Sequence, residues 1–188
     1  MKSKKEDTKI MLAESFKKLM VNHSFDKITI KMITDEASLI RPSFYNHFAD
    51  KYEMLEWICY KEIFEGAKLL ISNKMYVEAI NFIFTSIENH KDFYIKAVKI
   101  EGQNSFEDIF CDGLLTIFDA FFSAHDKNNM KFADVLSSSD ISKYYSKGMT
   151  YFISTWLEKG AEVPATVMCQ KYIILVSNSL ETVVLKEF

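Results

Sequence analysis

The sequence predicts an all-α protein, and three observations lead to this fold class. The chain of 188 residues holds only five Gly and two Pro, so it has few of the residues that form tight turns and hairpins. Apolar side chains recur at spacings of three and four residues along most of the chain, as on one face of a helix. No segment alternates apolar and polar residues in the way of a half-buried strand. We therefore expect about nine helices joined by short connections.

The first two helices are predicted from apolar stripes and a capping residue. A stripe within residues 8–22 predicts the first helix, and the segment 22–27, NHSFDK, ends it. Thr29 is placed to act as the N-cap of a second, short helix over 30–37. The inward-facing residues of the two helices are Leu12, Phe16, Leu19, Met20, Ile30, Ile33 and Ala37.

The stretch RPSFYNHF, residues 41–48, predicts a third helix with two different faces. Phe44 and Phe48 are four residues apart, so they share a face that can be buried against the first two helices. Pro42 suits the first helical position, because the amide that it lacks would have no helical partner there. The polar side chains on the other faces are Arg41, Ser43, Tyr45, Asn46 and His47. Two short helices joined by a tight turn, the second with an exposed polar face, are typical of a helix-turn-helix.

The rest of the chain is predicted to form longer helices. Asp50 and Glu53 have the spacing of a capping box and begin one of them. Further helices are expected over about 76–89, over about 90–101, and from a cap at Ser105 to about 124, before a loop-like stretch over 125–138. Two final helices are expected over about 139–159 and 163–187. Gly160 suits a left-handed end of the first, and Pro164 fits the first turn of the second.

The run from Thr29 to Leu55, TIKMITDEASLIRPSFYNHFADKYEML, resembles the DNA-binding signature of the tetracycline-repressor (TetR) family of bacterial transcription regulators. The matching elements are Thr29, Ala37 and the FYNHF pattern followed after two residues by Lys51. The resemblance implies a helix-turn-helix DNA-binding domain over residues 1–52 and a helical regulatory and dimerisation domain over 53–188. The chain departs from the family at Ser38 and Pro42, where Gly is frequent, and at Ile40, where Ser commonly caps the helix.

The resemblance also implies which side chains meet DNA. In the family, residues matching Thr29, Tyr45, His47 and Lys51 usually hold phosphates, and those matching Arg41, Pro42, Ser43 and Asn46 approach base edges. Arg41 is the only arginine of the chain, and a guanidinium can donate two parallel hydrogen bonds to guanine. A phosphate contact is the alternative for Arg41. In an ordinary helical bundle, by contrast, the aromatic residues of 41–48 would be core and Lys51 a solvated charge.

The second domain of the family responds to ligands and dimerises. The stretches 93–106 and 148–160 resemble a subgroup that includes dihydroxyacetone-kinase regulators, although the polar part of the first is also compatible with a simple turn. Ten aromatic residues between 76 and 122 predict a pocket for a small apolar or aromatic effector, with core packing as the alternative. The expected pocket residues are Phe84, His90, Tyr94, Gln103, Phe106 and Phe110.

The two last helices carry more apolar positions than one packing face needs, Tyr144 and Ile174 among them, which predicts a homodimer. The residues expected at its interface are Phe152, Trp156, Ile173, Val176 and Leu180.

Taken together, these features favour a DNA-binding transcription regulator, more often a repressor in this family, that binds a palindromic double-stranded DNA operator as a homodimer. Residues 1–52 carry ten basic and seven acidic side chains, a net charge of +3 that suits DNA, whereas the rest of the chain is acidic. An all-α enzyme or small-molecule carrier is the alternative, and a scaffold that binds only protein is a third. The sequence shows no phosphate loop, no HExxH and no nucleophile beside a His, so no enzyme is expected.

Bound groups and membranes are not expected either. Three widely spaced Cys and four His without metal-ligand spacing predict neither a disulfide nor a metal site, and no cofactor is expected. No apolar run approaches the ~20 residues of a membrane span, so we expect a cytoplasmic protein.

Overall fold

The computed structural model describes residues 4–102, 104–123, 135–179 and 182–183. These residues form ten α-helices, a 3-10 turn and a π-helical turn, and no strand occurs among them. The α-helices are α1 (Lys4–Asn22), α2 (Ile30–Glu36), α3 (Arg41–Tyr45), α4 (Lys51–Cys59), α5 (Glu65–Ser72), α6 (Tyr76–Asn89), α7 (Lys91–Ala97), α8 (Phe106–Ser123), α9 (Ser138–Glu158) and α10 (Ala165–Ser177). The 3-10 turn η1 is Phe25–Lys27, and the π-turn η2 is Tyr60–Phe64. The all-α prediction is confirmed.

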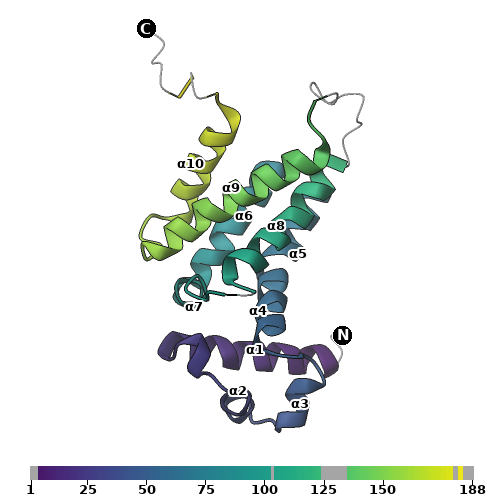
Figure 1. Cartoon of the computed structure of the whole chain (residues 1–188), viewed down its shortest axis with the longest axis vertical. Helices are drawn as coiled ribbons and strands as arrows, with labels where there is room; N and C mark the ends of the chain where they lie inside the picture. The colour runs from purple at the N-terminus through teal and green to yellow at the C-terminus, as the bar shows by residue number, and fades with distance from the viewer. Residues whose placement is uncertain (1–3, 103, 124–134, 180–181, 184–188) are drawn as a thin grey trace.

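The helices form two parts along the long axis of the molecule (Figure 1). The helices α1, α2 and α3 make up the head, with α1 lying across it and α2 and α3 on the side away from the rest of the chain. The helices α5–α10 make up the body, in which α8 and α9 run side by side and α10 packs on α6. None of the described helices is long and apolar enough to cross a membrane.

Head and body are joined by a helical segment that does not break. Asp50 caps α4, since its Oδ1 accepts from the amides of Tyr52 and Glu53 at 2.8 and 2.9 Å. From there α4 continues through η2 into α5, so these three elements correspond to one of the nine expected helices. The expected boundary between residues 52 and 53 lies in the first turn of α4, and the chain does not leave its helical path there.

The hydrophobic core runs continuously from the head into the body. The Phe16 ring of α1 meets the Phe25 ring of the head and the Phe93 ring of α7, each with ring centres 6.1 Å apart. Deeper in the body, the Phe106 ring packs between those of Tyr94 and Phe110, with ring centres 6.2 and 5.2 Å apart. Because α1 contributes to this core, the head is packed onto the body.

Most expected helices are present, and the differences lie at their ends. The helix α1 begins four residues before the expected start, and α10 ends at Ser177, well before the expected residue 187. Pro164 is the N-cap of α10, one position before the helical turn in which we expected it. Gly160 has a φ of +80°, as expected for a left-handed helix end. The loop expected over 125–138 falls largely outside the described residues.

Candidate nucleic-acid interface

The helix α2 and the turn after it place α3 on the outside of the head. The Thr29 hydroxyl accepts from the Met32 amide at 3.2 Å, which confirms the expected cap of α2. The turn passes through Ser38 at a φ of +55°, a left-handed conformation that glycine adopts at lower cost, and this explains why Gly is frequent there in the family. The Leu39 amide then returns to the Thr34 carbonyl at 2.8 Å, closing the turn.

The inner side of α3 is held by two phenylalanines. Phe44 and Phe48 are 0% and 1% exposed, and their ring centres lie 5.8 Å apart. Phe48 also meets the Trp57 ring of α4 at 5.8 Å. The Lys9 ammonium of α1 lies 5.0 Å from the Phe48 ring centre and 5.6 Å from that of Trp57. The helices α1 and α4 therefore both hold Phe48, which lies three residues beyond the end of α3.

The outer side of α3 carries polar groups that face solvent. Arg41, Pro42, Tyr45 and Asn46 are exposed, and Ser43 is half-buried. The guanidinium of Arg41 donates to the Tyr45 hydroxyl at 3.2 Å and lies 5.7 Å from the centre of its ring. These two side chains are thus held together before any ligand arrives. Ile40 is the N-cap of α3 and provides no side-chain hydrogen bond.

His47 is half-buried at the edge of this surface. Its Nδ1 is buried and has no hydrogen-bond partner among the described residues. Burial lowers the pKa of the imidazole, and the nearby charges of Lys5 and Lys9 lower it further. At neutral pH the ring is therefore uncharged, and its contribution to a phosphate contact would be a neutral hydrogen bond.

Lys51 does not point outward, contrary to our expectation of a side chain facing solvent. Its ammonium donates to the carbonyls of Phe25 and Ile28, both at 2.7 Å, and lies 4.3 Å from the centre of the Phe25 ring. Burial lowers its pKa, which the charge of Asp26 partly opposes. In the free chain Lys51 therefore ties α4 to the segment between α1 and α2.

Four of the six residues expected to line an effector pocket lie in the core. Phe84, Tyr94, Phe106 and Phe110 are buried, and none of them lines the hollows of about 490, 360 and 340 Å³ that the described residues form. Tyr94 donates to Glu62 Oε2 at 2.8 Å, and Phe84 packs against α9 and α10. These four residues therefore fill core, which was the alternative from the sequence.

The other two expected pocket residues lie elsewhere. His90 is exposed, at the rim of a hollow of about 360 Å³ between α1 and the α6–α7 junction. Gln103 lies outside the described residues.

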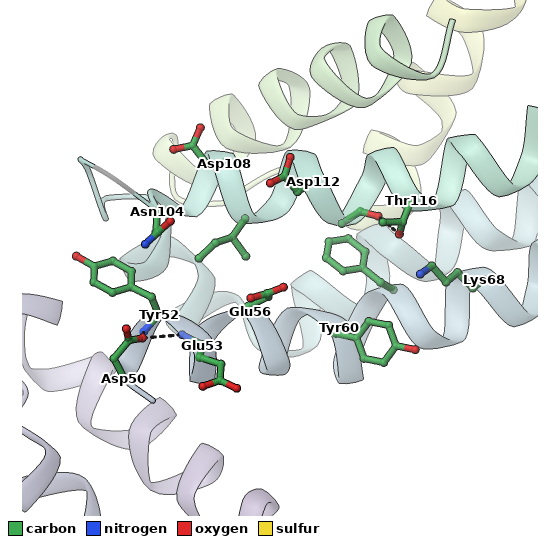
Figure 2. A pocket seen from close by; sticks show the side chains of 13 residues that line it. Asp50, Tyr52, Glu53, Glu56, Tyr60, Lys68, Asn104, Asp108, Asp112 and Thr116 are labelled. Carbon is green, nitrogen blue, oxygen red and sulfur yellow. Dashed lines mark hydrogen bonds between the residues drawn. The ribbon is translucent and has the colours of Figure 1, made fainter. Parts of the chain in front are cut away.

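A hollow that the sequence did not suggest lies between α4, η2 and α8 (Figure 2). Its volume is about 490 Å³. It is lined by the rings of Tyr52, Tyr60 and Phe64. Lys68 is the one basic residue among the described lining residues, 5.4 Å from the centre of the Tyr60 ring. Its acidic residues are Asp50, Glu53, Glu56, Asp108 and Asp112. Five carboxylates against one ammonium make the hollow a poor place for an anion. The signal in the sequence was the helical spacing of these acids, which is also that of an ordinary solvated face.

The residues expected at a dimer interface are only partly exposed. Trp156 is 4% exposed, and its indole donates to the Val163 carbonyl at 2.9 Å, so it serves the core of one subunit. Phe152 and Ile173 are half-buried, whereas Val176 is exposed; Leu180 lies outside the described residues.

A different set of apolar side chains faces solvent on α9 and α10. Tyr144 and Tyr151 of α9 are 74% and 73% exposed, and Ile174 and Leu175 of α10 are 55% and 54% exposed. Gly148 lies between the two tyrosines at helical spacing, and a side chain there would meet nothing within 4 Å. The sequence had suggested Tyr144 and Ile174 but not Tyr151 or Leu175.

No group of metal-binding side chains occurs among the described residues, and Cys59, Cys111 and Cys169 are free thiols. Burial raises the pKa of Cys59 strongly, so this thiol is inert at neutral pH.

The comparisons with known proteins agree with this architecture. Residues 76–178 match a TetR-type family model described as a transcriptional regulator C-terminal region. The HTH-type dhaKLM operon transcriptional activator DhaS of Lactococcus lactis subsp. lactis is 27% identical over 141 residues, which cover 73% of this chain and 72% of that protein.

Two solved structures share the fold. One is a dihydroxyacetone kinase operon activator DhaS, with a TM-score of 0.64 and 21% identity, over 90% of this chain and 94% of that one. The other is NalD of Pseudomonas aeruginosa, the secondary repressor of the MexAB-OprM multidrug efflux pump, with a TM-score of 0.57 and 13% identity, over 92% and 94%. The family model covers more than half of the chain, and the chain belongs to the TetR family of transcription regulators.

Proposed function

We propose that the protein binds a two-fold symmetric DNA operator as a homodimer and places α3 of each subunit in the major groove. The observation that carries this function is the division of α3 into a buried side, Phe44 and Phe48, and an exposed side with Arg41 and Asn46. A helix held in this way presents hydrogen-bonding groups without losing contact with the rest of the head. Such a regulator would act in the cytoplasm, where it meets DNA.

The predicted DNA-contact residues divide into two roles. Arg41, Pro42, Ser43 and Asn46 approach base edges, where a guanidinium and an amide can distinguish base pairs. Thr29, Tyr45, His47 and Lys51 hold phosphates, which sets the position on the duplex without reading sequence. For Lys51 this role requires its ammonium to exchange the carbonyls of Phe25 and Ile28 for a phosphate.

The dimer is supported by the four large apolar side chains that face solvent on α9 and α10, Tyr144, Tyr151, Ile174 and Leu175, together called the strip. Exposed clusters of large apolar side chains are uncommon on soluble monomers and are typical of interfaces. Because a two-fold axis relates identical surfaces, the strip would pair with its own copy. Two heads related in this way suit half-sites about one helical turn apart.

The similar proteins differ in the sign of regulation: DhaS is named an activator and NalD a repressor. The sequence favoured a repressor. In vitro transcription from a promoter that carries the operator decides between them: added protein lowers the transcript if it is a repressor and raises it if it is an activator.

The effector remains a prediction of a small apolar or aromatic ligand that acts on the body. The expected aromatic residues are packed against one another, so such a ligand would have to displace core rings. The acidic hollow of Figure 2 would accept a different chemical class, a cation. A thermal-shift screen with both classes of compound tests the prediction, which fails if only cations raise the melting temperature.

The direct test is a gel shift with the DNA upstream of the protein's own gene. We expect the wild-type protein and a Lys99→Ala control to form the same shifted complex, since Lys99 is exposed in the body, away from α3. The double variant Arg41→Ala/Asn46→Ala should lose that complex and keep its helical circular-dichroism spectrum. A folded double variant that shifts DNA as the wild type does would refute the assignment of α3.

A further inference from the structure

The head meets the body at a seam where η2 makes two ion pairs with α1. Lys61 and Glu62 are neighbours in this π-turn, and both reach across to α1. The Lys61 ammonium lies 3.2 Å from Glu6 Oε1, and Glu62 Oε1 accepts from the Lys17 ammonium. The two pairs have opposite polarity, since η2 supplies the cation to one and the anion to the other.

The second pair is buried and continues into the core of the body. Lys17 is 6% exposed, and its ammonium also lies 2.7 Å from Glu14. Burial disfavours the charge, but the hydrogen bonds to Glu14 and Glu62 outweigh it and raise the Lys17 pKa. The other oxygen of Glu62 accepts from the fully buried Tyr94 hydroxyl at 2.8 Å. One carboxylate thus connects α1 of the head to α7 of the body.

The two contact points on α1 are far apart. Glu6 and Lys17 are separated by eleven residues, which is three helical turns and about 16 Å along the axis. Two polar contacts at this separation constrain the direction of the helix more than either contact alone would. The π-turn that carries Lys61 and Glu62 is a rare element inside a helix and is frequent at functional positions.

We propose that Lys61 and Glu62 are positioning residues for DNA binding, which hold α1 at the angle that sets the separation of the two α3 helices in the dimer. They touch no DNA and act through the head. Hydrogen-bonded ion pairs suit this role because they depend on direction as well as distance, whereas the apolar contact of Phe16 with Phe93 tolerates sliding.

This inference rests on the proposed function. Its main test measures how strongly the protein prefers one spacing between the two half-sites. Operators with the half-sites moved one base pair closer or further apart are compared with the best operator by fluorescence anisotropy. For Glu62→Gln, which keeps an acceptor for Tyr94 and loses the charge facing Lys17, the preference for the best spacing should fall about five- to tenfold. The affinity for a single half-site should stay unchanged. A fall by the same factor at every spacing would mean that Glu62 only stabilises the fold, and would overturn the inference.

Two further variants separate positioning from stability. Glu65→Gln is the matched control, because Glu65 pairs with Lys61 at 3.0 Å within the same helical segment and makes no ion pair with the described residues of α1. Its spacing preference should equal that of the wild type. Lys17→Met/Glu62→Gln leaves no unpaired buried cation, so its unfolding midpoint should be close to that of the wild type while the spacing preference stays weak. Full recovery of the preference in this double variant would contradict a positioning role for the ion pair.

A measurement without DNA distinguishes failure of this inference from failure of the proposed function. Spin labels at Lys27→Cys in the head and Lys99→Cys in the body, in a Cys111→Ser background diluted with unlabelled chain, report the head–body distance within one subunit. We expect a narrow distribution in the wild type and a broader one in Glu62→Gln. Identical distributions would overturn the inference, whether or not the protein binds DNA.

Discussion

At the residue scale, Arg41 and Tyr45 are adjacent on the exposed side of α3, yet they should contribute differently to DNA binding. Arg41→Ala should relax preference at one base pair in each half-site and cost about 1–3 kcal/mol there. Tyr45→Phe removes only the hydroxyl and should weaken binding to all sequences by a similar factor, because phosphates are the same at every position. Competition binding with single-base operator variants measures both effects. Equal losses for specific and non-specific DNA in Arg41→Ala would show that Arg41 binds phosphate.

A second residue-scale prediction concerns His47 and pH. Its pKa in the folded chain lies below the ordinary 6.5, so the unfolded chain takes up the proton first as the pH falls. The stability that neutral His47 contributes is therefore fully present above pH 6.5 and is lost as the pH falls toward the folded-state pKa. Urea unfolding at pH 7.5 and 5.5 should show a smaller loss of stability for His47→Gln than for the wild type. An equal loss in both proteins would contradict this account.

At the element scale, α4 depends on the cation at its first residue. Lys51→Met keeps the aliphatic chain and leaves the carbonyls of Phe25 and Ile28 without their shared donor. We expect a loss of about 1–3 kcal/mol in the free energy of unfolding, measured with urea. Lys31→Met is the control, because Lys31 is exposed on α2 and pairs only with Asp35 at the surface. If both variants are equally stable, the carbonyl contacts of Lys51 contribute nothing to the stability of the fold. Any loss of DNA binding in Lys51→Met would then come from a lost DNA contact.

The crossing of α8 over η2 gives a second prediction at this scale. Gly113 of α8 lies so close to the Phe64 ring that an added Cβ would overlap it, and Phe64 is itself fixed against Phe110 with ring centres 5.2 Å apart. Gly113→Ala should gain about 1 kcal/mol of helix propensity but lose more to the clash, with a net loss of about 1–3 kcal/mol. Thermal unfolding measures the difference. A variant that melts at or above the wild-type temperature would show that the ring can move aside.

Whether a residue's role could be predicted from the sequence depends on how far along the chain its partners lie. Thr29, Asp50 and Gly160 act on neighbours within four residues, and their roles as caps could be predicted from the sequence. In the sequence, Lys51 resembles a surface cation and Trp156 resembles an aromatic residue of an interface. In the structure, both side chains donate to backbone carbonyls that only the fold brings near. The acidic hollow and the seam at Glu62 join segments far apart in the chain, and no local pattern predicts either.

At the scale of the whole molecule, the exposed strip on α9 and α10 predicts a dimer of about 44 kDa, twice the chain mass of 21.9 kDa. Leu175→Glu should shift sedimentation toward the monomer, because a carboxylate in an apolar interface loses its hydration. Leu69→Glu is the control, since Leu69 of α5 is also exposed, at 66% against 54% for Leu175, but lies outside the strip. A wild-type protein that sediments as a stable monomer of about 22 kDa at micromolar concentration would end the dimer proposal.

The central claim is that two copies of α3 read one symmetric DNA site, and selection from a random DNA pool tests it most directly. We expect the DNA retained by the wild-type protein to converge on two inverted half-sites whose centres lie about one helical turn apart. The same selection with Arg41→Ala should return the same spacing with one position of each half-site no longer defined. A retained pool without a shared motif, or a motif that lacks two-fold symmetry, would contradict the account.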